Sequence, residues 1–458
     1  MANWSKTTKN ATFMQVRMLV AMAVGLVTSR ITLQQLGVED YGAYSLVWGV
    51  LTLIVFANTT VCNASIRFLS YDLVEKEIGT LKNTFAACRR AHLYVAIAVA
   101  IIAETIGLLY IWLWANLPEG RLPGVIAVFQ ISMITVVATI LQSPYSSLLI
   151  AKERMDSYSA IEIVNVLLKL GLVCLLIVCS FDKLILLSSF YAILSVVIYF
   201  TYRLYCRNQF VEVTDASLMD KTKCHQILKF SATDLYGNAC VSARDNGFVI
   251  IINAFFGVVY NTACNLATVV NRAFSGLASN VLYAFKPQIT ISYAANDFRQ
   301  MSKLIGRSSF GSVSIMGVAV VIAISFMPFL LKLWLGEVPE NAIVFTNLLL
   351  ITGLVETIYN PLVTAIHSSG KIKALSFLNG TLYLINLPLI ALIYAIGLPA
   401  YSAYFCLIAI DVVIWISTMI IFKKVLPDVA ISNYLSAISF ALLLSAVVAV
   451  IIYSFVLA

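Results

Sequence analysis

Thirteen apolar segments, each longer than 20 residues, follow one another along almost the whole chain. They are residues 12–33, 43–66, 92–114, 125–150, 158–180, 184–206, 230–256, 259–284, 305–331, 342–366, 373–395, 399–422 and 433–457. A helix needs about 20 apolar residues to cross the hydrocarbon core of a bilayer. Helices also satisfy their own backbone hydrogen bonds there. The pattern predicts an all-α polytopic membrane protein with about 13 (12–14) transmembrane helices. A composition that is 61% hydrophobic and 11% charged agrees with this class.

The distribution of lysine and arginine between the connections predicts the orientation. With the N-terminus in the cytoplasm, the inner segments hold 23 of these residues and the outer connections hold three. Such a bias follows the positive-inside rule, so the net charge of +8 indicates membrane topology and no nucleic-acid partner. The nine cysteines form no CxxC pair and the three histidines are far apart, so we expect no metal site.

Charged residues occur inside the segment 230–256, at Asp234, Arg244 and Asp245. Charges at this depth are costly and usually face the interior of a helix bundle or an aqueous cavity. At 100° per residue, one arc of roughly 120° collects the polar side chains Ser231, Asp234, Asn238, Ser242, Asp245, Asn246 and Asn253. Arg244 lies outside this arc, and a pair with a neighbouring helix is its alternative role.

The next segment, 259–284, carries a narrower polar stripe. Its members are Asn261, Asn265, Thr268, Arg272, Ser275 and Ser279. Arg272 lies in the middle of the stripe and about halfway along the segment. The pattern favours a hydrophilic cavity that accepts an anion; the alternative is a structural arginine that binds a backbone carbonyl or a carboxylate of a neighbouring helix.

Weak similarities recur at a shift near 220 residues. LGVEDYGAY at 36–44 is similar to FGVVYNTAC at 256–264, and Ser70-Tyr71 is matched by Ser292-Tyr293. Pro144 and Pro361 each precede a basic residue by ten positions. The shift spans six predicted helices, an even number, so the two copies would enter the membrane in the same direction, as parallel repeats.

Several stretches resemble a known family, the Wzx-type polysaccharide-unit flippases of the multidrug/oligosaccharidyl-lipid/polysaccharide (MOP) exporter superfamily. They are SRITLQQLGVEDYGAYSLVWGV at 29–50, IRFLSYDLVEKEIGTLKNTF at 66–85, SPYSSLLIAKERMDSYSAIEIVNVLLKL at 143–170, FDKLILL at 181–187, NGFVIIINAFFG at 246–257, KPQI at 286–289, LKLWLGEVPE at 331–340 and PLVTAIHSSGKIKAL at 361–375. The likeness runs from about residue 10 to about residue 425. Cys264 departs from it, because relatives often have an arginine there.

The resemblance implies a MATE-like fold of two six-helix lobes, here residues 1–215 and 216–425, followed by an additional transmembrane helix in 426–458. It also implies a function without catalysis. An oligosaccharide repeat unit of O-antigen or lipopolysaccharide, linked to undecaprenyl diphosphate, would cross the bacterial inner membrane by alternating access through a cationic cavity. The expected partners are this lipid-linked oligosaccharide, membrane lipids, and a polysaccharide polymerase with its chain-length regulator.

In such a protein the first, second, seventh and eighth helices border the cavity. The candidate substrate-binding residues are Arg30, Arg67, Arg244, Asp245, Asn246 and Arg272. Arginine binds phosphate in a bidentate fork. Asp245 would balance the charge of the empty cavity and is a candidate for coupling to H⁺ or Na⁺; no other cofactor is expected.

Three other functions deserve comparison. A MATE-type drug or cation exporter would favour acidic groups, whereas the cavity helices carry four arginines against Asp234 and Asp245. A lipid II flippase needs nearly the same chemistry and remains an alternative. A membrane-embedded polymerase or ligase would need a sizeable outer loop, and the longest outer connections have about a dozen residues; we therefore expect no enzyme.

Overall fold

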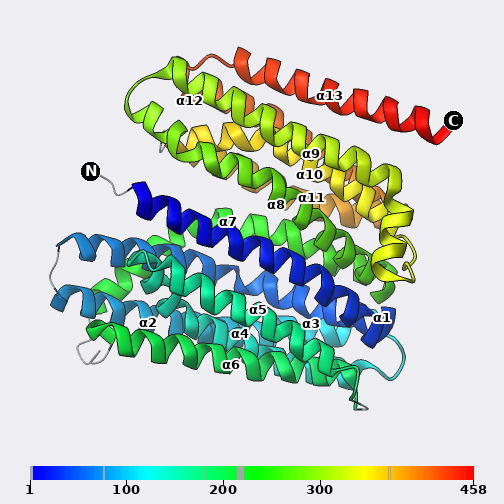
Figure 1. The fold of residues 1–458 in the computed structure, drawn as a ribbon. Coiled ribbons are helices and arrows are strands. Elements are labelled where there is room, and N and C mark those ends of the chain that lie inside the picture. Colours follow the sequence, from blue (N-terminus) through cyan, green and yellow to red (C-terminus); the bar gives the residue numbers. More distant parts are fainter. Residues whose placement is uncertain are drawn as a thin grey trace. The chain divides into compact units, whose positions relative to one another are not determined.

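The computed structural model describes residues 4–75, 78–179, 181–213, 221–369, 371 and 373–457, and every regular element within them is helical (Figure 1). The α-helices are α1 (Trp4–Glu75), α2 (Ile78–Ile102), α3 (Leu108–Leu113), α4 (Leu122–Ala151), α5 (Met155–Leu175), α6 (Lys183–Gln209), α7 (Lys221–Phe256), α8 (Val258–Ala294), α9 (Phe298–Leu335), α10 (Ala342–Ser368), α11 (Lys373–Ala395), α12 (Ser402–Val425) and α13 (Ser432–Leu457). A π-helical turn, η1 (Ala103–Gly107), joins α2 to α3, and a 3-10 turn, η2 (Val211–Val213), follows α6. The predicted all-α class is confirmed.

Among the described residues, eleven helical segments are long and apolar enough to cross a membrane, against thirteen predicted. One difference lies in α1, which contains two of the predicted segments and leaves helical geometry only at Gly37, with φ 78° and ψ 174°. Glycine adopts this positive φ without a steric penalty. The other difference is α8, which has 37 residues but is too polar to be among the eleven.

Packing divides the chain into two units, Met1–Asn261 and Thr262–Ala458. In the first unit, α1 packs against α2, α4, α5 and α7, and α4 packs against α6. The helix α7 therefore belongs to the first unit by its contacts, whereas the lobe boundary predicted at residue 215 precedes it.

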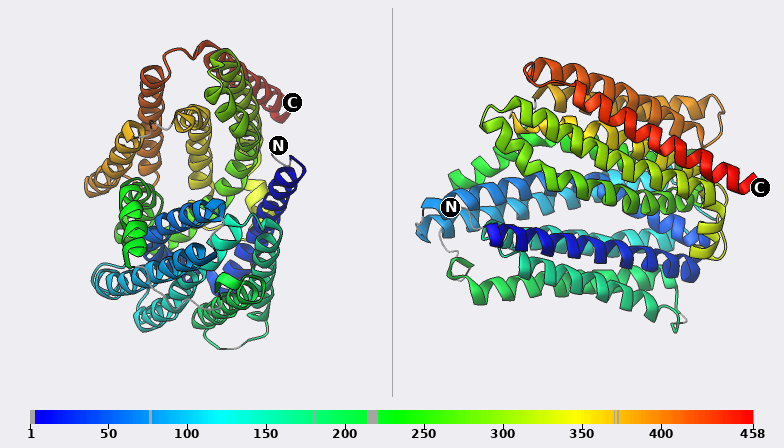
Figure 2. Two further views of the ribbon diagram at one scale, coloured as in Figure 1. Left: turned by 90° about the vertical axis from the view of Figure 1, so that its left-hand side faces the viewer. Right: turned by 45° about the horizontal axis from the view of Figure 1, so that its top comes forward.

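In the second unit, α9 packs against α10 and α13, and α12 packs against α10 and α11 (Figure 2). The helix α13 lies within the range 426–458, in which an additional transmembrane helix was predicted. Large apolar side chains remain exposed on these helices, among them Phe329 and Leu443 at 65% and 64%. Such surfaces suit contact with lipid.

The order of elements repeats at the predicted shift. The first segment of α1 corresponds to α7, its second segment to α8, and α2 with η1 and α3 to α9. The pairs α4 and α10, α5 and α11, and α6 and α12 follow in the same order. Gly37 is matched 220 residues later by Gly257, which has φ 83° and separates α7 from α8. Each copy of the weak sequence repeat thus has a glycine of positive φ between its first and second helical segments.

Candidate functional site

The helix α7 packs antiparallel to the second segment of α1. Gly49 faces Val249, Ser242 Oγ donates a hydrogen bond to the Thr52 carbonyl at 3.2 Å, and the Arg67 guanidinium lies 4.4 Å from the centroid of the Phe230 ring. Residue numbers rise along α1 while they fall along α7. These contacts fix the level of each candidate residue of α7 relative to α1.

Much of the polar arc predicted on α7 serves helix packing. Asn253 is fully buried, and its amide group accepts a hydrogen bond from the Asn116 backbone N–H at 3.1 Å and donates one to the Asn116 carbonyl at 3.2 Å. Ser231 and Ser242 are buried, and the Asn246 amide donates to the Ser242 carbonyl at 3.1 Å. The side chains of two further arc members, Asp234 and Asn238, lie outside the described part of the chain.

Arg244 and Asp245 form an ion pair on α7. Arg244 Nε lies 2.8 Å from Asp245 Oδ1, and the side chains are 17% and 46% exposed. The arginine thus pairs with its own neighbour in sequence, and the carboxylate stays accessible.

The three candidate substrate-binding arginines of the first unit, Arg30, Arg67 and Arg244, lie at different levels. The Arg17 guanidinium, in the first segment of α1, lies 5.4 Å from the centroid of the Tyr158 ring. Tyr158 packs in the same apolar cluster as Leu69, which is in the second segment of α1. The far ends of the two segments are therefore near one another, so the segments run in opposite directions from Gly37. At 1.5 Å per residue, Arg30 lies about 10 Å from this turn, and Arg67 about 45 Å from it. Arg244 is near the level of Thr52, about 22 Å from the turn. Arg30 is half-buried and Arg67 is exposed. These residues form a ladder and not a single cluster.

Arg272 belongs to the second unit, on α8, and its side chain is exposed. Among the described residues no hydrogen bond or ion pair involves its guanidinium. On the same stripe, Thr268 Oγ1 donates a hydrogen bond to the Cys264 carbonyl at 2.8 Å. Cys264 itself is buried with its sulfur 3.3 Å from the Tyr404 hydroxyl. The described contacts give no support to the structural alternative for Arg272.

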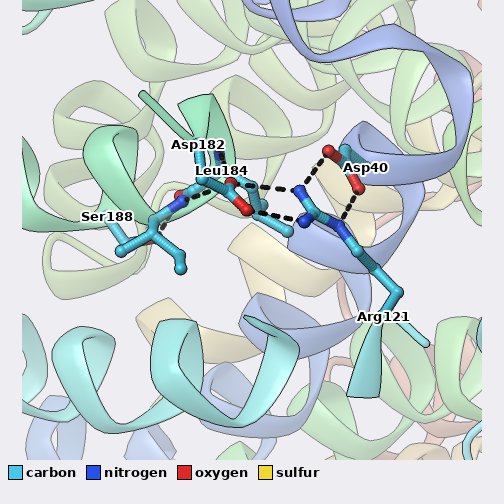
Figure 3. A network of polar contacts seen from close by, with 6 residues as sticks. Asp40, Arg121, Asp182, Leu184 and Ser188 are labelled. Atoms are coloured by element: carbon cyan, nitrogen blue, oxygen red, sulfur yellow. Dashed lines mark hydrogen bonds and ion pairs between the residues drawn. The ribbon is translucent and has the colours of Figure 1, made fainter. Parts of the chain in front are cut away.

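A polar network at the Gly37 end of the first unit was not predicted (Figure 3). Arg121, just before α4, binds Asp40 of α1 through Nε at 2.7 Å and Asp182, the N-cap of α6, through Nη1 at 2.6 Å. Asp182 also accepts hydrogen bonds from the backbone N–H groups of Leu184 and Ile185. Its bond to the Arg121 guanidinium is the main cause that lowers the pKa of Asp182. The N-cap position of Asp182 is visible in sequence, but its long-range partner is not.

A second network lies near the other end of the same segment of α1. Lys223 Nζ of α7 donates hydrogen bonds to Asp72 Oδ2 at 2.9 Å and to Thr84 Oγ1 of α2 at 2.7 Å, and the Thr84 hydroxyl donates to Asp72. Asp72 is 9% exposed. The second segment of α1 is therefore tied to different helices at its two ends.

No group of three or more histidine, cysteine, aspartate or glutamate side chains within the described residues could hold a metal ion. The titratable side chains of the two networks described above take part in ion pairs and hydrogen bonds with one another.

Comparison with known proteins finds structures of similar fold and no matching sequence family. No protein-family model matches the chain, and no curated protein matches it. Among solved structures, an inward-facing multidrug resistance MATE family transporter of the MOP superfamily superposes with a TM-score of 0.73 at 11% identity, covering 91% of this chain and 99% of that one. The lipid II flippase MurJ, in an inward closed conformation, gives 0.72 at 12% identity, covering 97% and 99%. The MATE multidrug transporter DinF-BH gives 0.69 at 13%, covering 92% and 96%.

The fold thus defines the class: a polytopic helical membrane protein with the architecture of MOP-superfamily transporters. Within that class the chain is similar over nearly its full length to both MATE transporters and MurJ. The MATE-like part of the predicted fold is confirmed.

Proposed function

We propose that the protein flips an undecaprenyl-diphosphate-linked oligosaccharide repeat unit across the bacterial inner membrane by alternating access, with its N-terminus in the cytoplasm. The observation that carries the proposal is the ladder of Arg30, Arg244 and Arg67 along the first unit. A diphosphate that crosses a bilayer must exchange its counter-charges step by step, because an uncompensated charge in hydrocarbon costs many kcal/mol. Arginines whose backbone levels lie at about 10, 22 and 45 Å from the turn at Gly37 would provide such steps.

The remaining candidate residues have consistent roles in this mechanism. Arg272, exposed and without a described partner, would bind the diphosphate in its bidentate fork. Asp245 would hold Arg244 while the cavity is empty and release it when the phosphate arrives, which also makes Asp245 the candidate for coupling to H⁺ or Na⁺. Asn246 would contact sugar hydroxyls. A polymerase and a chain-length regulator would receive the flipped unit.

The similarity to MurJ favours a second candidate, a lipid II flippase. Both substrates combine a polyprenyl diphosphate with a glycan, so the arginines would serve either one. A MATE-type drug or cation exporter is supported by the fold, but a cationic substrate would be repelled by the arginine ladder. Competition between the two lipid-linked glycans in one vesicle assay separates the two flippase functions.

The test is transport of a lipid-linked oligosaccharide in inverted vesicles, normalised to the amount of protein in the membrane. Arg272→Ala should weaken apparent substrate affinity by about tenfold or more, since a charge-assisted hydrogen bond contributes about 1.5–3 kcal/mol. Arg272→Lys should keep part of the activity, because lysine retains the charge and loses the fork.

Arg299→Ala is the matched control, since Arg299 is an exposed arginine near the start of α9. It should transport normally. A structural role for Arg272 would instead lower the amount of protein in the membrane and leave transport per molecule unchanged, and that result would remove Arg272 from the mechanism.

A further inference from the structure

A groove of about 730 Å³ runs between α9 and α13 in the second unit. Lys303, Arg307 and Phe310 line it from α9, and they are exposed at spacings of four and three residues, which places them on one helix face. The α13 wall includes Phe440 and Leu443, which are 66% and 64% exposed.

Small residues explain why the two helices are close and why a trough follows their contact line. A side chain at Gly306 would place its Cβ 2.8 Å from the Asn433 carbonyl oxygen, and Gly317 faces Ser445. Asn433 also donates a hydrogen bond to Ser302 Oγ at 2.9 Å. From one contact to the next, the residue numbers rise along both helices, so α9 and α13 run parallel. Close helix approach at glycine is the usual packing mode in membranes.

The groove has opposite chemical character at its two ends. Lys303 and Arg307 are at the end where both helices begin, and no aspartate or glutamate is among the described residues that line it. Asp297, just before α9, is the N-cap of that helix, and its side chain accepts a hydrogen bond from the Gln300 N–H at 2.9 Å. The far end is formed by apolar side chains. Two cations followed by an apolar trough complement an anionic head group with an acyl chain.

The length of the trough matches one leaflet. The contacts of Gly306 with Asn433 and of Gly317 with Ser445 place Val447, the last lining residue, near the level of residue 319. That level is 12 residues beyond Arg307, or about 18 Å. One leaflet contributes about 15 Å of hydrocarbon. The groove therefore has about the length of one phospholipid chain within a leaflet.

We propose that the groove between α9 and α13 is a binding site for an anionic phospholipid, with its phosphate at Lys303 and Arg307 and one acyl chain along Phe310, Phe440 and Leu443. The site is distinct from the arginine ladder, which lies in the first unit, and it does not depend on the proposed transport function. Surface-exposed cations attract any anionic lipid weakly; the apolar trough adds the contacts that keep one lipid in place.

Native mass spectrometry of the purified chain, titrated with phosphatidylglycerol or phosphatidylcholine of equal acyl length, measures the site directly. The wild type should bind one phosphatidylglycerol at least about tenfold more tightly than phosphatidylcholine. The double variant Lys303→Gln/Arg307→Gln should reduce this preference by at least about tenfold, since each of the two basic residues near a head group contributes about 1 kcal/mol. Both residues are exposed, so the fold should tolerate the change.

Two further variants separate this site from general surface charge. Lys423→Gln/Lys424→Gln removes two cations at the end of α12 and should leave the preference unchanged. Ala437→Leu narrows the trough and keeps both cations, and it should weaken phosphatidylglycerol binding. Equal binding of the two lipids by the wild type, an equal loss in the α12 variant, tighter binding of a polyprenyl phosphate, or a dimer whose formation excludes lipid would each overturn the proposal.

Discussion

One guanidinium, that of Arg121, connects the turn of α1 with the starts of α4 and α6. Both of its carboxylate partners are mostly shielded, at 24% exposure for Asp40 and 33% for Asp182. Bidentate pairs in a network contribute more than isolated surface pairs. We expect Arg121→Gln to lower the free energy of unfolding by about 1–2 kcal/mol at pH 7, seen as a lower thermal midpoint in detergent.

The same pair predicts a pH dependence. The folded-state pKa of Asp182 is lowered by the hydrogen bond from Arg121, so its contribution is fully present above the unfolded-state pKa of about 3.9 and is lost as pH falls through the folded value. The difference between the wild type and Arg121→Gln should therefore stay constant from pH 7 to 5 and shrink below about pH 4. The control is Lys332→Gln, which removes an exposed cation in the last turn of α9. An equal effect of the two substitutions would show that the network adds no stability.

Residue periodicity predicted the faces of the site helices but not their surroundings. The arc on α7 was predicted as a polar face, and its members Ser242 and Asn253 form hydrogen bonds with α1 and with the connection after α3. A hydrophobic pattern cannot tell a packing face with hydrogen bonds from a face that lines water. Asp40 lies in α1, whereas Arg121 and Asp182 lie in two separate connections, and their pairing required the fold. The assignment of Arg30, Arg67, Arg244, Asp245, Asn246 and Arg272 to substrate stays a prediction.

At the scale of elements, hydropathy located the helices and missed their ends. The predicted segment 230–256 lies inside α7, which begins at Lys221, and 259–284 lies inside α8, which ends at Ala294. Beyond these segments the composition becomes more polar, but helical geometry continues. At Gly37 a single residue of positive φ is enough to separate two predicted segments.

The packing of α9 against α13 predicts an effect of a single methyl group. Gly306→Ala would place Cβ against the Asn433 carbonyl, a backbone atom that cannot rotate away. Overpacking of this kind costs about 1–3 kcal/mol, and the thermal midpoint should fall. Gly171→Ala is the matched control in α5, where a Cβ would meet nothing within 4 Å. There the higher helix propensity of alanine should leave stability unchanged or slightly raised. Equal thermal midpoints for the two variants would show that α13 shifts to accommodate the added methyl group without loss of stability.

At the scale of the whole molecule, the distribution of basic residues predicts the orientation in the membrane. A reporter that is active only in the cytoplasm should be active when fused after Lys82, Gln209 or Arg299, and silent after Leu117 or Val338. Lys82, Gln209 and Arg299 lie near the ends of α2, α6 and α9, and Leu117 and Val338 lie in the connections that follow α3 and α9. The reverse pattern of activity would overturn the cytoplasmic N-terminus and the direction of transport.

The fold class could be predicted from the sequence because length and hydropathy alone restrict a chain of this kind to a helical bundle. The six-helix repeat could also be predicted, since the shift near 220 residues recurs in the order of elements. The division by packing could not, because α7 begins the second repeat but packs against α1.

The polarity of α8 has a consequence for biosynthesis. A segment with Asn265, Arg272 and Ser279 along one face gains little free energy from entering lipid, since a central arginine alone costs about 2.5–3.5 kcal/mol on insertion scales. The apolar α9 that follows by a connection of three residues supplies the driving force that α8 lacks. During synthesis, α8 should therefore enter the bilayer only once α9 has emerged from the ribosome, so that the two are committed to the membrane as one hairpin.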